Sequence, residues 1–270
     1  MKQVLLTNDD GYKSAGILAL YEVLSQDFDV IVVAPDGERS WMGKSMSAHN
    51  SIRLVERSYV GHTFHVTNGT PADCVRLGLY EVCKEIPAFV VSGINIGSNF
   101  GHSRMLSSGT IGAAIEGAID GVKSIAVSLC NTKNRGIDFF DPENKVYFRT
   151  AALLTARLLQ AVEDSTYAQG IDVLSVNVPF EATSKSEIVI TRPSTGSYGK
   201  LFEQTDFDSE SYQHTGASIS KESKNSLELD TDLAAIQNGQ ISIAPLDISL
   251  TAPGAQNYLE QNLLPRLRRL

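Results

Sequence analysis

Oxygen-bearing side chains follow three of the apolar runs in this 270-residue chain. Asp9 and Asp10 come directly after the first run, Ser40 follows the second, and Asn95 follows a later one. If these runs are parallel strands, their carboxyl ends meet at one edge of a sheet. Two carboxylates, a hydroxyl and an amide carbonyl are hard oxygen ligands, which suit Mg²⁺, Mn²⁺ or Ca²⁺. The pattern therefore favours a divalent cation site at that edge.

A simpler interpretation of the Asp9-Asp10 pair is that one aspartate caps the next helix and the other is solvated, since capping is a common use of Asp. Adjacent carboxylates repel each other, however, and a bound dication is the usual way to keep both ionised. The matching ligand types after two later strands favour the cation. No cluster of His or Cys in the sequence favours zinc.

A second candidate group surrounds the start of a predicted helix at Ile111. Ser108, Gly109 and Thr110 precede that helix, where free backbone N–H groups and the positive end of the helix dipole can bind a phosphate. The alternative is a plain Ser or Thr N-cap. Asn99, in the glycine-containing loop just before, either hydrogen-bonds a phosphate oxygen or occupies a turn that needs a positive φ.

The elements that would position these residues alternate between short apolar runs and segments of helical periodicity. Such alternation predicts an α/β fold of Rossmann-like, doubly wound type with a mostly parallel sheet, and a core over about residues 1–190. Residues 52–66 predict a hairpin flap around Gly61. Predicted strands cover residues 4–6, 30–34, 89–91, 125–129, 173–178 and 241–244, and predicted helices cover residues 17–24, a segment starting at 71, 111–119, 151–162 and 258–264.

The chain turns polar and acidic between residues 196 and 232. This stretch is either a solvated loop or a protruding arm that packs on another subunit. We predict a single domain over residues 1–270, in which a β-rich arm covers about residues 191–240 and a C-terminal strand and helix cover about residues 241–270.

Charge and composition exclude several classes of protein. A net charge of -8 argues against non-specific binding to nucleic acid or to an anionic membrane, because both need a surplus of Lys and Arg. No stretch approaches the ~20 apolar residues that span a bilayer. The first strand begins almost directly after Met1, and the odd number of cysteines fits neither a zinc motif nor a disulfide framework, so we expect a cytoplasmic protein with reduced thiols.

The chain also resembles the SurE family of survival nucleotidases over nearly its whole length. The matching stretches, in fixed order, are residues 6–11 (LTNDDG), 33–40 (VAPDGERS), 69–75 (GTPADCV), 91–95 (VSGIN), 108–110 (SGT), 175–179 (SVNVP), 231–233 (TDL) and 241–246 (ISIAPL). The resemblance implies that Asp9, Asp10, Ser40 and Asn95 bind one divalent cation per subunit, with Mg²⁺ or Mn²⁺ expected. It implies that the substrate is a nucleoside 5'- or 3'-monophosphate.

By the same resemblance, Asp9 and Asp10 would be catalytic, and Asn99, Ser108, Gly109 and Thr110 would face the phosphate. A homodimer or homotetramer would form by exchange of C-terminal elements. The chain departs from the family's pattern at Ser98, where proline is usual, and in a longer loop over residues 101–107. Two other functions stay open: a phosphatase for short polyphosphate or other phosphomonoesters, and a nucleotide- or metal-binding module without turnover.

Overall fold

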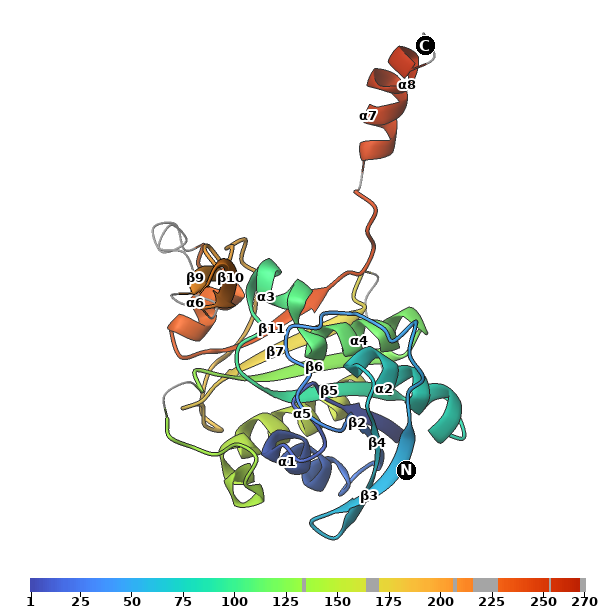
Figure 1. The fold of residues 1–270 in the computed structure, drawn as a ribbon, viewed down its shortest axis with the longest axis vertical. Helices are drawn as coiled ribbons and strands as arrows, with labels where there is room; N and C mark the ends of the chain where they lie inside the picture. Colours follow the sequence, from blue (N-terminus) through green and yellow to red (C-terminus); the bar gives the residue numbers. More distant parts are fainter. Residues whose placement is uncertain (133–134, 164–169, 206–207, 216–227, 253, 268–270) are drawn as a thin grey trace.

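A nine-stranded sheet runs through the molecule, with helices on both faces (Figure 1). The computed structural model describes residues 1–270 except 133–134, 164–169, 206–207, 216–227, 253 and 268–270. The strands of this sheet are β1 (Gln3–Thr7), β2 (Asp29–Pro35), β3 (Leu54–Tyr59), β4 (His62–Thr67), β5 (Phe89–Ile96), β6 (Lys123–Cys130), β7 (Val173–Pro179), β8 (Ile188–Ile190) and β11 (Ile241–Leu246).

Six α-helices of the described chain lie between strands in the sequence, and two follow the last strand. The first six are α1 (Ala15–Leu24), α2 (Pro71–Leu77), α3 (Gly101–Ser107), α4 (Gly109–Ile119), α5 (Arg149–Val162) and α6 (Asp232–Gln237), with the short helical segments η1 (Gly78–Val82) and η2 (Pro142–Phe148). The last two are α7 (Ala255–Asn262) and α8 (Leu264–Leu267). All six predicted strands and the predicted helices are present, so the α/β prediction is confirmed. Helix α3 lies where the sequence predicted only a loop.

The strand order is β3-β4-β2-β1-β5-β6-β7-β11-β8. Strands β4, β2, β1, β5, β6 and β7 run parallel, and β11 returns antiparallel to β7. The chain thus moves outward from β1 in both directions, which is the doubly wound arrangement. The loops after β1, β2 and β5 consequently leave the same edge of the sheet side by side.

Alternate residues of β1 are buried on opposite faces of the sheet. Val4 and Leu6 belong to the larger core, which α1 and α5 cover, while Leu5 packs with Cys74 and Val75 of α2. All five side chains are fully buried. This period of two is what a strand covered by helices on both sides requires.

The β3–β4 hairpin extends the sheet instead of forming a flap. Strand β4 pairs in parallel with β2, and β3 then forms the outer edge. The turn at Val60 and Gly61 has positive φ at both residues (47° and 77°), as a tight two-residue hairpin turn requires. The sequence predicted the hairpin correctly but not its pairing partner.

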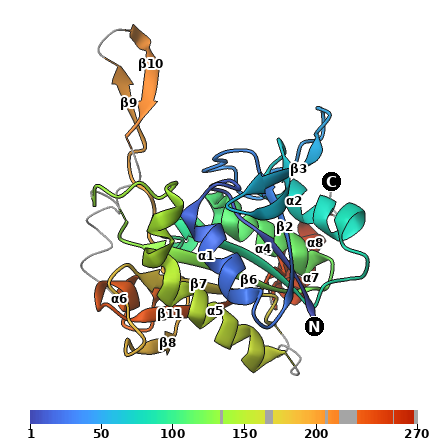
Figure 2. The same ribbon diagram turned by 90° about the horizontal axis from the view of Figure 1, so that it is seen from below.

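Two segments project from the body. Strands β9 (Phe202–Thr205) and β10 (Asp208–His214) form a separate antiparallel hairpin, which stands away from the sheet in Figure 2. We call residues 194–215 the hairpin arm. Helices α7 and α8 extend in another direction, beyond the end of β11 (Figure 1).

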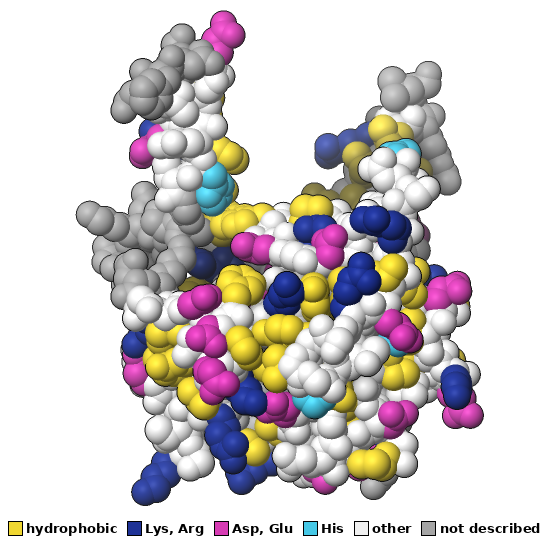
Figure 3. All heavy atoms as spheres, turned by 60° about the horizontal axis from the view of Figure 1, so that its bottom comes forward, with side chains coloured by type: hydrophobic (Ala, Val, Ile, Leu, Met, Phe, Trp, Pro, Cys, Tyr) yellow, Lys and Arg dark blue, Asp and Glu magenta, His cyan; other side chains and the backbone are white. Residues whose placement is uncertain are grey.

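The surface carries charges of both signs. On the face drawn in Figure 3, Lys and Arg side chains are interspersed with Asp and Glu side chains over the body. Within the described residues, no helix is both long enough and apolar enough to cross a membrane.

Candidate active site

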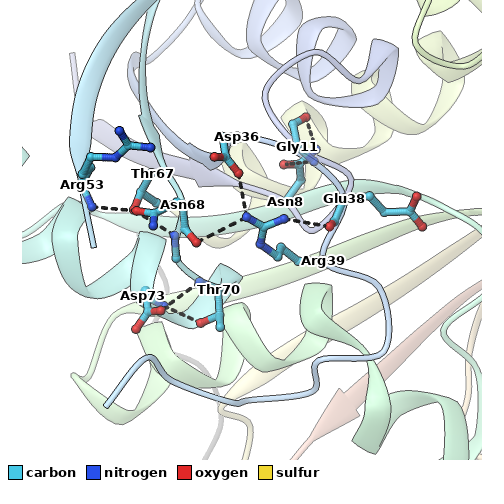
Figure 4. Close-up of polar contacts among 11 residues, drawn as sticks. Asn8, Gly11, Asp36, Glu38, Arg39, Arg53, Thr67, Asn68, Thr70 and Asp73 are labelled. Atoms are coloured by element: carbon cyan, nitrogen blue, oxygen red, sulfur yellow. Dashed lines mark hydrogen bonds and ion pairs between the residues drawn. The ribbon is translucent and has the colours of Figure 1, made fainter. Parts of the chain in front are cut away.

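The turn after β1 holds two buried carboxylates. Asn8 fixes this turn: its side-chain amide donates to the carbonyl of Gly11 (3.0 Å) and to Ser14 Oγ (2.9 Å), and its Oδ1 accepts from the Gly11 N–H (3.2 Å; Figure 4). Ser14 in turn caps α1 by accepting from the Ile17 N–H. The helix start and the aspartate turn therefore form one rigid unit, in which Asp9 and Asp10 are 4% and 6% exposed.

Each aspartate is held through one carboxylate oxygen. Thr110 Oγ1 donates to Asp9 Oδ1 at 2.6 Å, and the Ile96 N–H donates to Asp10 Oδ2 at 3.0 Å. The backbone N–H groups of Asp9 and Thr110 also interact favourably with the Asp9 carboxylate. Strand-end loops from β1 and β5 and the start of α4 thus meet at this pair.

The loop after β2 brings Ser40 to the same place. Its neighbour Arg39 anchors the loop, donating from the guanidinium to the Asp36 carboxylate (2.6 Å) and to the Asn68 carbonyl (3.3 Å), as Figure 4 shows. The Arg39 N–H also donates to the Asp9 carbonyl (2.7 Å). The Ser40 hydroxyl donates to Glu38 Oε1 at 2.6 Å, which leaves the oxygen lone pairs of Ser40 available as acceptors.

Asn95 lies near the end of β5 and is oriented in a similar way. Its side-chain N–H donates to the Gly97 carbonyl at 2.9 Å, so its carbonyl oxygen Oδ1 points to the other side. Asp9, Asp10, Ser40 and Asn95 therefore share one property: hydrogen bonds within the protein fix each side chain, and each side chain carries an oxygen atom of a kind that can bind a cation.

A cleft of about 600 Å³ opens beside this group. Its lining residues are Asp9, Ser40, Trp41, Asn95, Ile96, Gly97, Ser98, Asn99, Arg104, Ser107, Ser108 and Tyr198. Five of the eight predicted site residues line it, from loops that are up to about one hundred residues apart in sequence. The predicted convergence of Asp9, Ser40 and Asn95 is present in the structure.

Three predicted site residues, Asp10, Gly109 and Thr110, lie behind the lining. Thr110 is fully buried and its hydroxyl is bonded to Asp9. A Cβ on Gly109 would lie 2.9 Å from the Asp9 Cβ, so glycine allows α4 to start directly against the carboxylate. The geometry gives Gly109 and Thr110 a role in positioning Asp9.

Ser108 and Asn99 line the cleft but also have structural partners. Ser108 is the N-cap of α4, accepting from the Ile111 N–H at 3.1 Å, so the plain capping interpretation is correct for its oxygen. Asn99 donates from its side chain to Ser128 Oγ (2.9 Å). Both residues still lie on the wall of the cleft.

Burial controls the protonation of both aspartates. It raises the pKa of Asp9 from 3.8 to about 6, although the hydrogen bond from Thr110 partly opposes this rise. Burial, and next the negative charge of Asp9, raise the pKa of Asp10 well above its ordinary value. Within the described residues, neither carboxylate forms an ion pair with Lys or Arg. A cation of another kind would restore both to the ionised form.

Sequence reasoning missed several residues of the cleft. Arg104 is the one Lys or Arg among the described residues that line it. Glu38 is a third carboxylate, whose charge contributes to raising the pKa of both aspartates and which binds Ser40. Tyr198 comes from the hairpin arm, and nothing local in the sequence marks it. The signal available for Arg104 was its place one turn before the Ser-Gly-Thr segment.

Comparison with known proteins identifies the family. The sequence profile described as Survival protein SurE matches residues 4–200. The chain belongs to the SurE family. It is 38% identical to the protein named 5'-nucleotidase SurE from Archaeoglobus fulgidus, over 93% of each chain, and 36% identical to the one from Methanococcus maripaludis strain C6, over 96% of this chain and 97% of the relative.

A solved structure of the SurE family supports the same assignment. The crystal structure of SurE protein from Aquifex aeolicus superimposes with a TM-score of 0.76 at 30% sequence identity, covering 96% of this chain and 99% of that one. The similarity therefore extends over nearly the whole of both chains. The fold predicted from the sequence is thus also that of a solved family member.

Proposed function

We propose that this protein is a phosphoric monoester hydrolase that converts nucleoside 5'- and 3'-monophosphates to nucleoside and phosphate, with one divalent cation bound per subunit. The observation that carries the proposal is that Asp9, Ser40 and Asn95, from three separate strand-end loops, line one cleft beside a buried second carboxylate. The relatives named 5'-nucleotidase SurE support the choice of nucleotides as substrates.

The donor set fits a divalent cation. Two adjacent carboxylates are buried without a Lys or Arg partner in the described structure. Within the described residues, no group of three or more His, Cys, Asp or Glu forms a metal site, so the remaining ligands would be the hydroxyl of Ser40 and the amide of Asn95. Such neutral and anionic oxygens suit Mg²⁺ or Mn²⁺. When bound, the cation would lower the pKa of a water and offset phosphate charge.

Residues of the protein itself would orient the attacking water and bind the phosphate. Asp9 would orient the attacking water, because it lines the cleft and Thr110 holds its Oδ1. Arg104 would bind the phosphate through charge-assisted hydrogen bonds. Asn99 and Ser108, on the wall next to the first turn of α4, would contact the remaining phosphate oxygens, where the helix dipole favours negative charge.

A phosphate-release assay tests the proposal. We expect release from AMP and GMP with Mn²⁺ or Mg²⁺, loss in EDTA and recovery on adding metal back. Asp9→Asn and Asp10→Asn should each lose most activity. Asp27→Asn is the matched control, because Asp27 is exposed and precedes β2 at the opposite edge of the sheet. Wild-type rates in both site variants would refute the proposal.

The same assay separates the two rival functions. Faster release from tripolyphosphate or from a simple phosphomonoester than from any nucleotide would favour the broader phosphatase. Nucleotide binding without release under any metal would favour a non-catalytic binding module. Both rivals would use the same cleft, so substrate turnover is the property that distinguishes them.

We also propose a homodimer or homotetramer formed by exchange of C-terminal elements, as the family resemblance implies. Tyr258, Leu259 and Leu263 of the projecting α7 region are exposed. An apolar groove beside α3 and α4, lined in part by Met105 and Ile115, is a surface that such a helix from a second copy could cover. Deleting residues 249–270 should lower the number of subunits per particle, which light scattering gives from the particle mass. An unchanged number of subunits would contradict the exchange.

Two expectations from the sequence remain part of the proposal. The first is that residues 1–270 form one domain with the core, arm and C-terminal boundaries given above. The second is cytoplasmic residence, which the free thiols of Cys74, Cys83 and Cys130 support. Fractionation of cells from the source organism would test the second.

A further inference from the structure

Trp41 is placed unusually for a large aromatic residue. It follows Ser40 directly, lines the cleft, and is 47% exposed. Its φ is 64°, in the left-handed region that costs a non-glycine residue roughly 1–2 kcal/mol. Backbone strain of this kind concentrates at binding and catalytic sites. Burial does not explain the position of the indole, because half of it faces solvent.

The hairpin arm holds the indole in place. The ring centroids of Trp41 and Tyr198 are 5.1 Å apart at a 48° tilt, and those of Trp41 and His214 are 4.7 Å apart in a T-shaped contact. Tyr198 is itself fixed to α3, since its hydroxyl donates to the Ser103 carbonyl at 2.7 Å and contacts Ser107 Oγ. The indole is thus supported by a rigid element while part of its surface stays open to the cleft.

The lining of the cleft therefore includes two chemically different groups. They are the oxygens of Asp9, Ser40 and Asn95, and the aromatic rings of Trp41 and Tyr198. Because consecutive Cα atoms are about 3.8 Å apart, the aromatic group begins one residue from the proposed cation site. A substrate whose phosphate lies at the oxygens would therefore have its other groups close to the aromatic rings.

We propose that Trp41, supported by Tyr198 and His214 of the hairpin arm, is the surface on which the nucleobase of the substrate stacks. This inference rests on the proposed nucleotidase function and adds a residue that determines specificity. The tilt between the two rings leaves no parallel slot between them, so the base would pack on the open face of the indole, with Tyr198 behind it. The competing interpretation is that the aromatic cluster only attaches the hairpin arm to the body.

Intrinsic fluorescence tests binding directly, because Trp41 is the chain's single tryptophan. The full-length protein with Mn²⁺ would be titrated with adenosine, which has no phosphate to hydrolyse, and separately with ribose and inorganic phosphate. We expect saturable quenching by adenosine alone. The same response to ribose, or no response to adenosine up to millimolar concentration, would overturn the inference.

Kinetics with Trp41→Ala supply a second test. Base–aromatic stacking predicts a fall of about 5- to 150-fold in kcat/KM for AMP, and a change of less than about twofold for ribose 5-phosphate, which lacks the base. Trp41→Phe should keep part of the AMP activity. Met42→Ala is the matched control, because Met42 is equally exposed in the same turn but does not line the cleft. Equal losses for AMP and ribose 5-phosphate in Trp41→Ala would show that the aromatic cluster is only structural.

The two tests separate this inference from the function on which it rests. If the wild-type protein releases no phosphate from any substrate, the nucleotidase proposal fails, and the adenosine titration still decides whether Trp41 binds a base. If AMP is hydrolysed but Trp41→Ala keeps wild-type kcat/KM for AMP, the stacking inference fails and the nucleotidase proposal stands.

Discussion

The buried aspartate pair should make the metal-free protein less stable as the pH rises. The pKa of Asp9 is 3.8 in an unfolded chain and about 6 in the fold. Below pH 3.8 the carboxyl is protonated in both states and does not change the free energy of unfolding. Between pH 3.8 and 6 the folded protein keeps a proton that the unfolded chain has lost, so stability falls as the pH rises. Above pH 6 the buried group ionises and the loss of stability levels off. A difference of about 2.2 in pKa, at about 1.4 kcal/mol each, destabilises the fold by about 3 kcal/mol.

Asp9→Asn removes this cost and keeps an oxygen that can accept from Thr110. In EDTA at pH 8 we expect the variant to unfold with a free energy about 3 kcal/mol larger than that of the wild type. At pH 5 the folded Asp9 is mostly protonated, so about half of the wild type's loss is recovered and the gap falls to about half. Urea denaturation followed by circular dichroism at pH 5, 6, 7 and 8 measures both values.

The control and the effect of metal make this prediction specific. Asp27→Asn changes an exposed carboxylate and should stay within about 0.5 kcal/mol of the wild type at every pH. Adding Mn²⁺ should stabilise the wild type, because the proposed site for the ion exists only in the folded protein, and should stabilise Asp9→Asn much less. The reasoning would be wrong if Asp9→Asn were no more stable than the wild type at pH 8 in EDTA, or if its advantage did not shrink at pH 5.

Three further substitutions address the groups around Asp9. Thr110→Val removes a charge-assisted hydrogen bond worth roughly 1.5–3 kcal/mol, so the Kd for Mn²⁺, measured by calorimetry, should rise about tenfold or more. Thr110→Ser keeps the hydroxyl and should leave this Kd unchanged. Equal Kd values in the two variants would contradict the reasoning. Arg104→Met should raise KM for AMP about tenfold or more in steady-state assays. The KM of Arg104→Lys should lie between those of Arg104→Met and the wild type. An unchanged KM in Arg104→Met would mean that Arg104 does not bind the phosphate. Gly109→Ala places a Cβ 2.9 Å from the Asp9 Cβ and 3.0 Å from the Pro71 Cγ. We expect urea denaturation to show a loss of ~1–3 kcal/mol in the free energy of unfolding. Wild-type stability in this variant would mean that α4 can shift freely.

The sequence predicted the parts of the site that depend on local pattern. Apolar runs such as residues 4–6 and 89–91 became parallel strands because both faces of the sheet are covered, and the polar residues after them met at one edge. That rule alone predicts that Asp9, Ser40 and Asn95 lie close together. The N-cap at Ser108 followed from the same kind of short-range reasoning.

Elements held by distant contacts escaped prediction. The segment Gly101–Ser107 has weak helical periodicity, and α3 forms there because the Gly101 N–H donates to the Asp232 carboxylate at 2.7 Å, across 131 residues of chain. The same carboxylate accepts from the Ser194 N–H at 2.9 Å. One buried aspartate from a late part of the chain thus fixes both α3 and the start of the hairpin arm, which no short window of sequence reveals.

The cleft likewise contains residues that local sequence pattern predicts and residues that distant contacts position. The oxygen donors depend on strand order and on the short loops that follow the strands. Arg104 and Tyr198 lie on the two segments that the Asp232 anchor joins, and Trp41 contacts Tyr198. Breaking the anchor with Asp232→Ala should therefore impair contacts with the base and the phosphate, while the carboxylate pair, which is fixed by Thr110 and the Ile96 N–H, should still bind Mn²⁺. Loss of Mn²⁺ binding in that variant would mean that the two halves of the cleft are not independent.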